Sequence, residues 1–327
     1  MIARANRLIL PIGLPLVMLF GVFLPAPGAA LDQARPLGIS VSDLCVLTIF
    51  FVNGLNMRLS GTRDRQLLRA LLLVLGINLI LAPLLAAGVI MSVDITLGVL
   101  LGMALMASVP TTLSSGAVIA INAGGDRVWA LALTVVTVLI GSVTAPLAIS
   151  ALLSTAVSIN PWPLLLDTAV MVLVPTAAGW LVRRTIWPKQ PAWLGLVPSA
   201  AVLTVVWMTM STYADEARAM SLALIGLMVL VGAVGHGVLL GASSLASRGM
   251  PHRQAMPVLF IGSQKTLPLA LTMLVLVIEA VPALAVAASV ATITCVIWHF
   301  IQVFADSLLG NRLAIRAATS RPAPTAG

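Results

Sequence analysis

Long apolar stretches separated by short polar breaks run along almost the whole chain. A membrane helix needs about 20 mostly apolar residues, and the breaks leave ten stretches of about that length or more. These stretches lack the short alternation of barrel strands, which excludes an outer-membrane barrel. The pattern therefore predicts an all-α polytopic membrane protein with ten transmembrane helices, at 8–27, 38–57, 66–90, 95–123, 127–154, 161–182, 192–213, 219–246, 252–278 and 281–305.

Composition supports this class and excludes others. Of 327 residues, 60% are hydrophobic and only 9% are charged, whereas a soluble domain carries about 25% charged residues. The net charge of +8 comes from short basic clusters between the apolar stretches. Such clusters orient a membrane protein and do not indicate a nucleic-acid partner. Cys45 and Cys295 fall inside predicted spans, without metal-ligand spacing, and we interpret both as packing residues.

The basic residues also predict the orientation. With ten spans, 15 of the 18 cationic residues fall on one side of the membrane, and only Arg35 and Arg218 fall on the other. The positive-inside rule then places both termini in the cytoplasm, and we expect the protein in the cytoplasmic membrane. An alternative is a cleaved secretory signal at residues 1–30, which would leave nine spans. We expect the first helix to be retained, because the repeat described next uses it.

Two predicted spans, 95–123 and 252–278, are interrupted midway by residues that a lipid-facing helix avoids. An offset of 154 residues aligns Thr111 with Lys265 and aligns the first five spans approximately with the last five. Because five is odd, the second copy enters from the opposite side, which predicts two inverted repeats, at 1–154 and 155–308. A disordered cytoplasmic tail is predicted at 309–327. The interruptions read Pro110-Thr111-Thr112-Leu113-Ser114-Ser115-Gly116 and Gly262-Ser263-Gln264-Lys265-Thr266-Leu267-Pro268.

Broken helices at matching points of an inverted repeat indicate the binding site of a secondary transporter. Their unpaired backbone groups need a partner near the midplane, and hydroxyls there can bind Na⁺ or a polar substrate. Alternatively, Ser and Thr pack helices together and bond their own backbone. The candidate residues in the two interruptions are Thr111, Thr112, Ser114, Ser115, Ser263, Gln264, Lys265 and Thr266.

Lys265 is one of only two lysines and lies at mid-membrane, where an ionisable residue is a candidate functional group. Its ammonium can attract an anionic substrate or replace a coupling cation between the two broken helices. Alternatively, it forms a purely structural pair with an acid, and the candidate acids are Asp43 and Asp167.

Three further kinds of polar residue lie inside apolar spans. Asn78 and Thr134 can complete a coordination shell or bond a neighbouring helix. His236 and His299 have no partner at metal-ligand spacing, and we interpret them as packing or locally hydrogen-bonded residues.

These residues together resemble the bile acid:sodium symporter family, in particular its divergent branch that contains the seventh human paralogue. The resemblance covers nearly the whole chain. It depends on Phe50 to Leu55, Asn78 to Pro83, Pro110 to Ser115 with Gly124-Gly125-Asp126, and Gly262 to Thr266.

The resemblance implies a panel domain, made of the first, second, sixth and seventh helices, and a core domain that holds the two crossed, broken helices. It also implies alternating access between the two domains. In the sodium-coupled members two Na⁺ sites lie behind the crossover. By position, the matching residues here are Asn78, Ser115, Thr134, Ile261, Ser263 and Gln264.

This chain departs from that pattern in the ninth helix. The acid that both sodium sites share matches Phe260, and the Asn after the family's Gln matches Lys265. Losing an acid and gaining a cation weakens Na⁺ binding by charge repulsion. Two hypotheses for coupling therefore remain. In one, sodium is the coupling ion and binds at Ser115, Thr134 and Gln264. In the other, coupling occurs through protonation of Lys265.

The predicted function is secondary active transport of a small organic anion by alternating access, with sodium coupling left open. The alternative is a regulatory membrane protein that has kept the scaffold without transport. An intramembrane hydrolase would need a nucleophile and a base at membrane depth, and His236 and His299 lie outside both interruptions. There is no phosphate-binding Gly-rich loop and no cofactor motif, so we expect neither an enzyme nor ATP-driven pumping. Substrate identity, stoichiometry and oligomeric state do not follow from the sequence.

Overall fold

The computed structural model describes residues 2–57, 65–112, 115–154, 160–187 and 191–319. All regular structure in these residues is helical, which confirms the all-α prediction. The helices of the first half are α1 (Ile2–Phe23), α2 (Pro25–Gln33), η1 (Pro36–Gly38), α3 (Val41–Asn56), α4 (Arg65–Leu75), η2 (Gly76–Leu81), α5 (Ala82–Ser92), α6 (Leu97–Ser108), α7 (Ser115–Asn122) and α8 (Arg127–Leu153). Those of the second half are α9 (Pro161–Thr168), η3 (Ala169–Leu173), α10 (Val174–Thr185), η4 (Ala192–Leu196), α11 (Val197–Thr212), α12 (Ala214–Arg218), α13 (Leu222–Ala246), α14 (His252–Ser263), α15 (Leu267–Ala280), η5 (Pro282–Ala287) and α16 (Ala288–Thr319).

Within the described residues, six helical stretches are long and apolar enough to cross a membrane, which confirms a multi-pass membrane protein. A seventh is added if α1 and α2, bent by 94°, form one span. The predicted spans at 38–57, 95–123 and 192–213 correspond to shorter apolar helices, α3, α6 with α7, and α11. The number of ten spans therefore stays a prediction.

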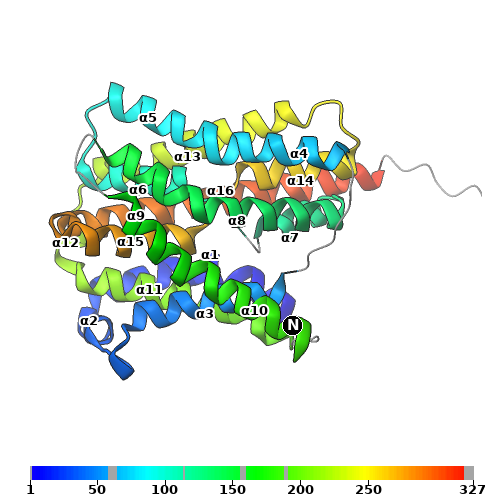
Figure 1. Ribbon diagram of the computed structural model, residues 1–327. Coiled ribbons are helices and arrows are strands. Elements are labelled where there is room, and N and C mark those ends of the chain that lie inside the picture. The colour runs from blue at the N-terminus through cyan, green and yellow to red at the C-terminus, as the bar shows by residue number, and fades with distance from the viewer. Residues whose placement is uncertain (1, 58–64, 113–114, 155–159, 188–190, 320–327) are drawn as a thin grey trace, which may run out of the picture.

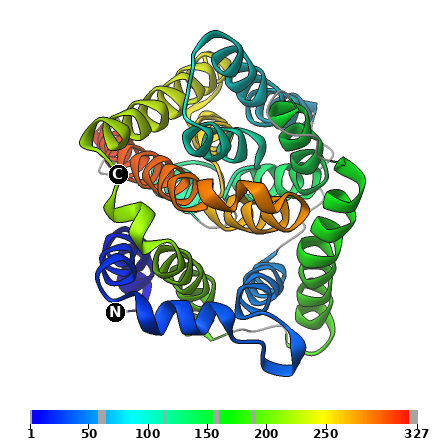
Figure 2. The same ribbon diagram turned by 90° about the vertical axis from the view of Figure 1, so that its left-hand side faces the viewer.

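The helices form two groups (Figures 1 and 2). In one group α1, α2, α3, α10 and α11 pack against one another. In the other, α4, η2, α5, α8, α13 and α16 pack around the two broken helices, α6 with α7 and α14 with α15. The long helix from α9 through η3 to α10 joins the groups, because its first part packs on α8 and α15 and its last part on α3. We call these the first and second helix groups.

Glycines bring two helices of the first group, α3 and α10, into close contact. A Cβ atom on Gly179 would lie 2.0 Å from the backbone oxygen of Phe51, and one on Gly54 would lie 2.1 Å from that of Thr176. Only a residue without a side chain fits at either place. The α3–α10 pair is therefore a small-residue helix contact of the kind that stabilises membrane proteins.

The predicted disordered tail at 309–327 is wrong for its first part, because α16 continues as a helix to Thr319. Leu309 and Leu313, four residues apart on one helical face, pack against the buried cluster formed by α4, α7, α8 and α14. This apolar contact stabilises the helix beyond residue 308. Residues 320–327 lie outside the part of the chain that the structure describes.

Candidate functional site

Both predicted interruptions are breaks between helices. The first break lies between α6 and α7, and the second, Gln264–Thr266, lies between α14 and α15. Pro110 cannot donate a backbone hydrogen bond, and Pro268 is favoured at the start of α15. The Thr266 backbone N–H donates to the Pro110 carbonyl at 2.9 Å. The two breaks, far apart in sequence, therefore meet directly.

Gln264 joins the two breaks through its side chain. Its Oε1 accepts hydrogen bonds from the hydroxyls of Thr112 at 3.1 Å and Ser115 at 3.0 Å. These two hydroxyls also lie 2.7 Å apart, and Thr112 Oγ1 accepts from the backbone N–H of Gly116. Thr112 thereby satisfies one of the backbone N–H groups in the first turn of α7. Three of the predicted site residues therefore form one buried polar cluster.

Asn78 approaches the second break from a third helix. It lies in η2, a π-helical turn within the span Arg65–Ser92, and it is fully buried. Its Nδ2 donates to the backbone oxygens of Ile261, Gly262 and Gln264 at 3.3, 3.2 and 2.8 Å. The end of α14 exposes carbonyls that lack helical partners. Asn78 therefore gives these carbonyls a hydrogen-bond donor and links η2 to the break.

Lys265 is fully buried, and its ammonium is surrounded by backbone oxygens. Nζ donates to the carbonyls of Asn78, of Ala107 at 2.8 Å and of Val109 at 2.9 Å, and it lies 3.3 Å from Asn78 Oδ1. The Ala107 and Val109 carbonyls end α6, where the helix dipole favours a cation. Neither proposed acid, Asp43 or Asp167, is among these partners.

Four polar side chains outside the predicted site complete this region, and none of them was predicted as a site residue. Gln302 in α16 accepts from the Lys265 backbone N–H at 3.0 Å, and its Nε2 donates to the Lys265 carbonyl and to His299 Nδ1. One turn further, Asp306 Oδ2 accepts from Gln264 Nε2 at 2.7 Å, and Oδ1 lies 3.0 Å from His236 Nε2.

The sequence contained a signal for this face. Gln302 and Asp306 are four residues apart on one face of an apolar helix, but the predicted span ended at residue 305, which placed Asp306 in a loop.

The other predicted residues differ in their surroundings. Thr111 and Thr134 are buried, and their hydroxyls have no hydrogen-bond partner in the described structure. Ser263 donates to Leu259 of its own helix at 2.9 Å, which fits the alternative of local backbone bonding. Thr266 contributes its backbone, as described above. Ser114 lies outside the described residues.

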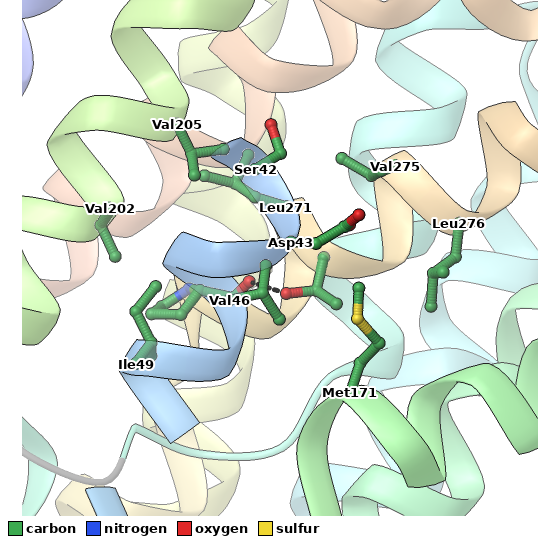
Figure 3. A pocket seen from close by; sticks show the side chains of 12 residues that line it. Ser42, Asp43, Val46, Ile49, Met171, Val202, Val205, Leu271, Val275 and Leu276 are labelled. Atoms are coloured by element: carbon green, nitrogen blue, oxygen red, sulfur yellow. Dashed lines mark hydrogen bonds between the residues drawn. The ribbon is translucent and has the colours of Figure 1, made fainter. Parts of the chain in front are cut away.

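A cleft lies between the two helix groups. Its lining comes from α3, η3 and α11 on one side and α15 on the other, as Figure 3 shows. Most of the lining is apolar, and Asp43 is the one charged residue in it. The lining residues are Ser42, Asp43, Val46, Ile49, Met171, Val202, Val205, Pro268, Leu271, Thr272, Val275 and Leu276.

Interrupted helices that meet at buried polar side chains within a multi-pass helical protein define a membrane transporter. Comparison with known families agrees. The model of the SBF-like CPA transporter family matches residues 9–315, so the chain belongs to this family.

Two plant proteins are among its relatives, and both are described as probable chloroplastic sodium/metabolite cotransporters, BASS4. The protein from Oryza sativa subsp. indica is 26% identical over 91% of this chain and 74% of its own length. The protein from Arabidopsis thaliana is 28% identical over 64% of this chain and 51% of its own length.

Proposed function

We propose that this transporter is a secondary active transporter that moves a small organic solute by alternating access. In this proposal the chain has ten spans in two inverted five-helix repeats, at 1–154 and 155–308. The first helix group is the panel domain and the second is the core domain. The proposal is supported by the direct contact of the two helix breaks and by the cleft between the two groups.

The cleft is the proposed substrate site, because both helix groups line it and movement of one against the other would open it. Its apolar lining suits the carbon skeleton of an organic solute. We retain a small organic anion as the proposed substrate class. Lys265, the residue that motivated it, does not line the cleft, and its ammonium already has backbone partners. To bind an anion, the Lys265 ammonium would therefore have to leave these backbone oxygens in another conformation.

One observation carries our proposal for coupling: the Lys265 ammonium, on the second broken helix, lies among backbone oxygens from the end of the first broken helix and from η2. Oxygens from unwound helices are the ligands that coupling cations have in secondary transporters. We propose that the ammonium occupies the position of such a cation. The relatives' names make sodium the first ion to test, with Ser115, Thr134 and Gln264 as further proposed ligands.

The test is thermal unfolding of the purified protein in detergent, titrated with Na⁺ and with K⁺ as the ion control. Lys265→Ala removes the ammonium and leaves space beside the carbonyls, whereas Lys265→Met fills that space. We expect Na⁺ to stabilise Lys265→Ala, by about 2.7 kcal/mol at 100 times its Kd, and to stabilise neither wild type nor Lys265→Met. Equal stabilisation of all three proteins by Na⁺ would place the sodium site elsewhere and refute the replacement.

A second experiment addresses transport itself. Proteoliposomes would be presented with labelled small carboxylates and, as the matched set, amines of similar size. Uptake of carboxylates supports the organic anion, and uptake of amines alone would refute it in favour of a cation that pairs with Asp43. Folded protein that takes up neither set would favour the regulatory membrane protein over a transporter.

A further inference from the structure

A buried ionisable pair lies next to the second helix break and outside both breaks. His236 in α13 and Asp306 in α16 are 2% and 0% exposed, and His236 Nε2 lies 3.0 Å from Asp306 Oδ1. The two helices pack against each other along the second group. Ionisable residues at membrane depth are costly and are typically functional. The pair therefore requires an explanation that the substrate cleft and Lys265 do not provide.

The pair is connected to both helix breaks through Gln264. Asp306 accepts from the Gln264 amide at 2.7 Å, and the same amide group accepts from Thr112 and Ser115 of the first break. A change in the charge or position of Asp306 would therefore reach the first break through one side chain.

The imidazole of His236 has an unused position. When Nε2 carries the hydrogen and donates to Asp306, Nδ1 is a lone-pair acceptor. Nδ1 is buried and has no hydrogen-bond partner in the described structure. His299 differs, because its Nδ1 already accepts from Gln302 at 3.0 Å. His236 therefore has a buried ring nitrogen without a hydrogen-bond partner in the described structure, and a carboxylate in place to stabilise a positive charge.

The charged and titratable residues around the pair come from several helices. Lys265 and Asp306 carry opposite charges when both are ionised, and a proton on His236 adds one positive charge to this region. The α6 and α7 segments that pack nearby carry no titratable side chain. The other charged or titratable residues on helices packed against α13 or α16 are Arg4, Arg7, Arg65, Arg69, Asp215, Glu216, Arg218, His252, Arg253 and Glu279, and α16 itself adds Cys295, His299, Arg312 and Arg316.

An open surface cavity lies about one turn along α13 and α16 from the pair, toward the end of α13 that precedes Arg248, and neither His236 nor Asp306 lines it. Its lining includes Gly237 and Leu240, next to His236 and one turn beyond it, and Leu309, which follows Asp306 by three residues. A Cβ atom on Gly237 or on Gly241 would meet nothing within 4 Å. Opening of this cavity toward His236 would provide a route for water.

We propose that His236 Nδ1, with Asp306 as its counter-charge, is a proton-binding site that couples to the helix breaks. A proton from water binds the Nδ1 lone pair and makes an imidazolium, and its release to water on the other side restores the neutral ring. The imidazolium attracts the Asp306 carboxylate and weakens its hydrogen bond to Gln264. This inference rests on the proposed transport function for its role, but the site itself is testable without transport.

The experiment counts protons. The variant His252→Gln with His299→Gln leaves His236 as the only histidine, and adding His236→Gln gives the matched control. In unbuffered detergent solution between pH 8 and 5, we expect the single-histidine protein to bind about one more proton per chain than its control. Asp306→Asn in the single-histidine background is expected to reduce that uptake by more than half, because the imidazolium loses its counter-charge.

Equal proton uptake with and without His236 would overturn the proposal, as would full uptake in Asp306→Asn. Nitrogen NMR of histidine-labelled single-histidine protein gives the same answer without substituting His236, because Nδ1 must gain a hydrogen over this pH range. Proton binding without any solute uptake would leave this site in place and contradict the transport function. Solute uptake without proton binding would overturn this proposal alone.

Discussion

Asn78 offers the sharpest test of how the second helix break is held. Its side chain provides two hydrogens to three backbone oxygens of α14 and the break, and its Oδ1 lies 3.3 Å from the Lys265 ammonium. Asn78→Ala would remove all of these contacts. It would leave buried carbonyls without a donor in a place that neither lipid nor water reaches.

The magnitude follows from the number of hydrogens involved. Side-chain hydrogen bonds in membrane proteins contribute about 0.6 kcal/mol on average and up to about 1.7 kcal/mol. Two donated hydrogens and one from Lys265 therefore predict that Asn78→Ala lowers the free energy of unfolding by roughly 2 to 5 kcal/mol. This loss is large compared with that of most single substitutions.

The assay is reversible unfolding in mixed detergent, with Thr137→Val as the matched control. Thr137 is fully buried in the neighbouring helix α8, and its hydroxyl has no hydrogen-bond partner in the described structure. Its replacement keeps the side-chain shape and should change the unfolding free energy by less than about 1 kcal/mol. If Asn78→Ala is no less stable than Thr137→Val, the contacts at the break contribute nothing and the reasoning is refuted.

Two further predictions concern the frame around the site. Gly179→Ala should destabilise the protein by about 1 to 3 kcal/mol, because the new Cβ would meet the Phe51 oxygen at 2.0 Å. The control is Gly76→Ala, where a Cβ meets nothing within 4 Å. Equal stability of the two variants would contradict the close helix contact. Asp126→Ala should lower the free energy of unfolding by about 1 kcal/mol, measured by thermal unfolding, because the carboxylate caps α8 by accepting from the backbone N–H groups of Val128 and Trp129. If this loss of stability disappears at high salt, the effect belongs instead to the exposed ion pair of Asp126 with Arg253.

The location of the candidate site could be predicted from the sequence to a large extent. Polar interruptions in two long apolar stretches marked both helix breaks, and Gln264, Lys265, Thr112 and Ser115 all lie where the breaks meet. Asn78 was also identified, because an amide inside an apolar span needs a partner. These residues are visible in sequence because each violates the local hydrophobic pattern.

The partners of these residues could not be predicted in the same way. For Lys265 the sequence left an anion, a carboxylate or the position of a coupling cation open. Its ammonium binds backbone oxygens, which every residue has and no sequence pattern reveals. Asp306 was missed, because α16 continues well beyond the predicted end of its span at residue 305. The continuation depends on Leu309 and Leu313 packing against other helices.

The sequence by itself determined that the protein is helical, that it lies in a membrane and where two of its helices break. These properties follow from the length and composition of contiguous segments, since lipid imposes the same requirement on every apolar stretch. Only the tertiary structure decided that the side chains of His236, Asp306 and Gln302 lie beside the helix breaks. It also decided that the backbone carbonyl of Asn78 accepts a hydrogen bond from Lys265, 187 residues away. Such contacts depend on how helices distant in sequence pack together, and local hydrophobicity does not contain that information.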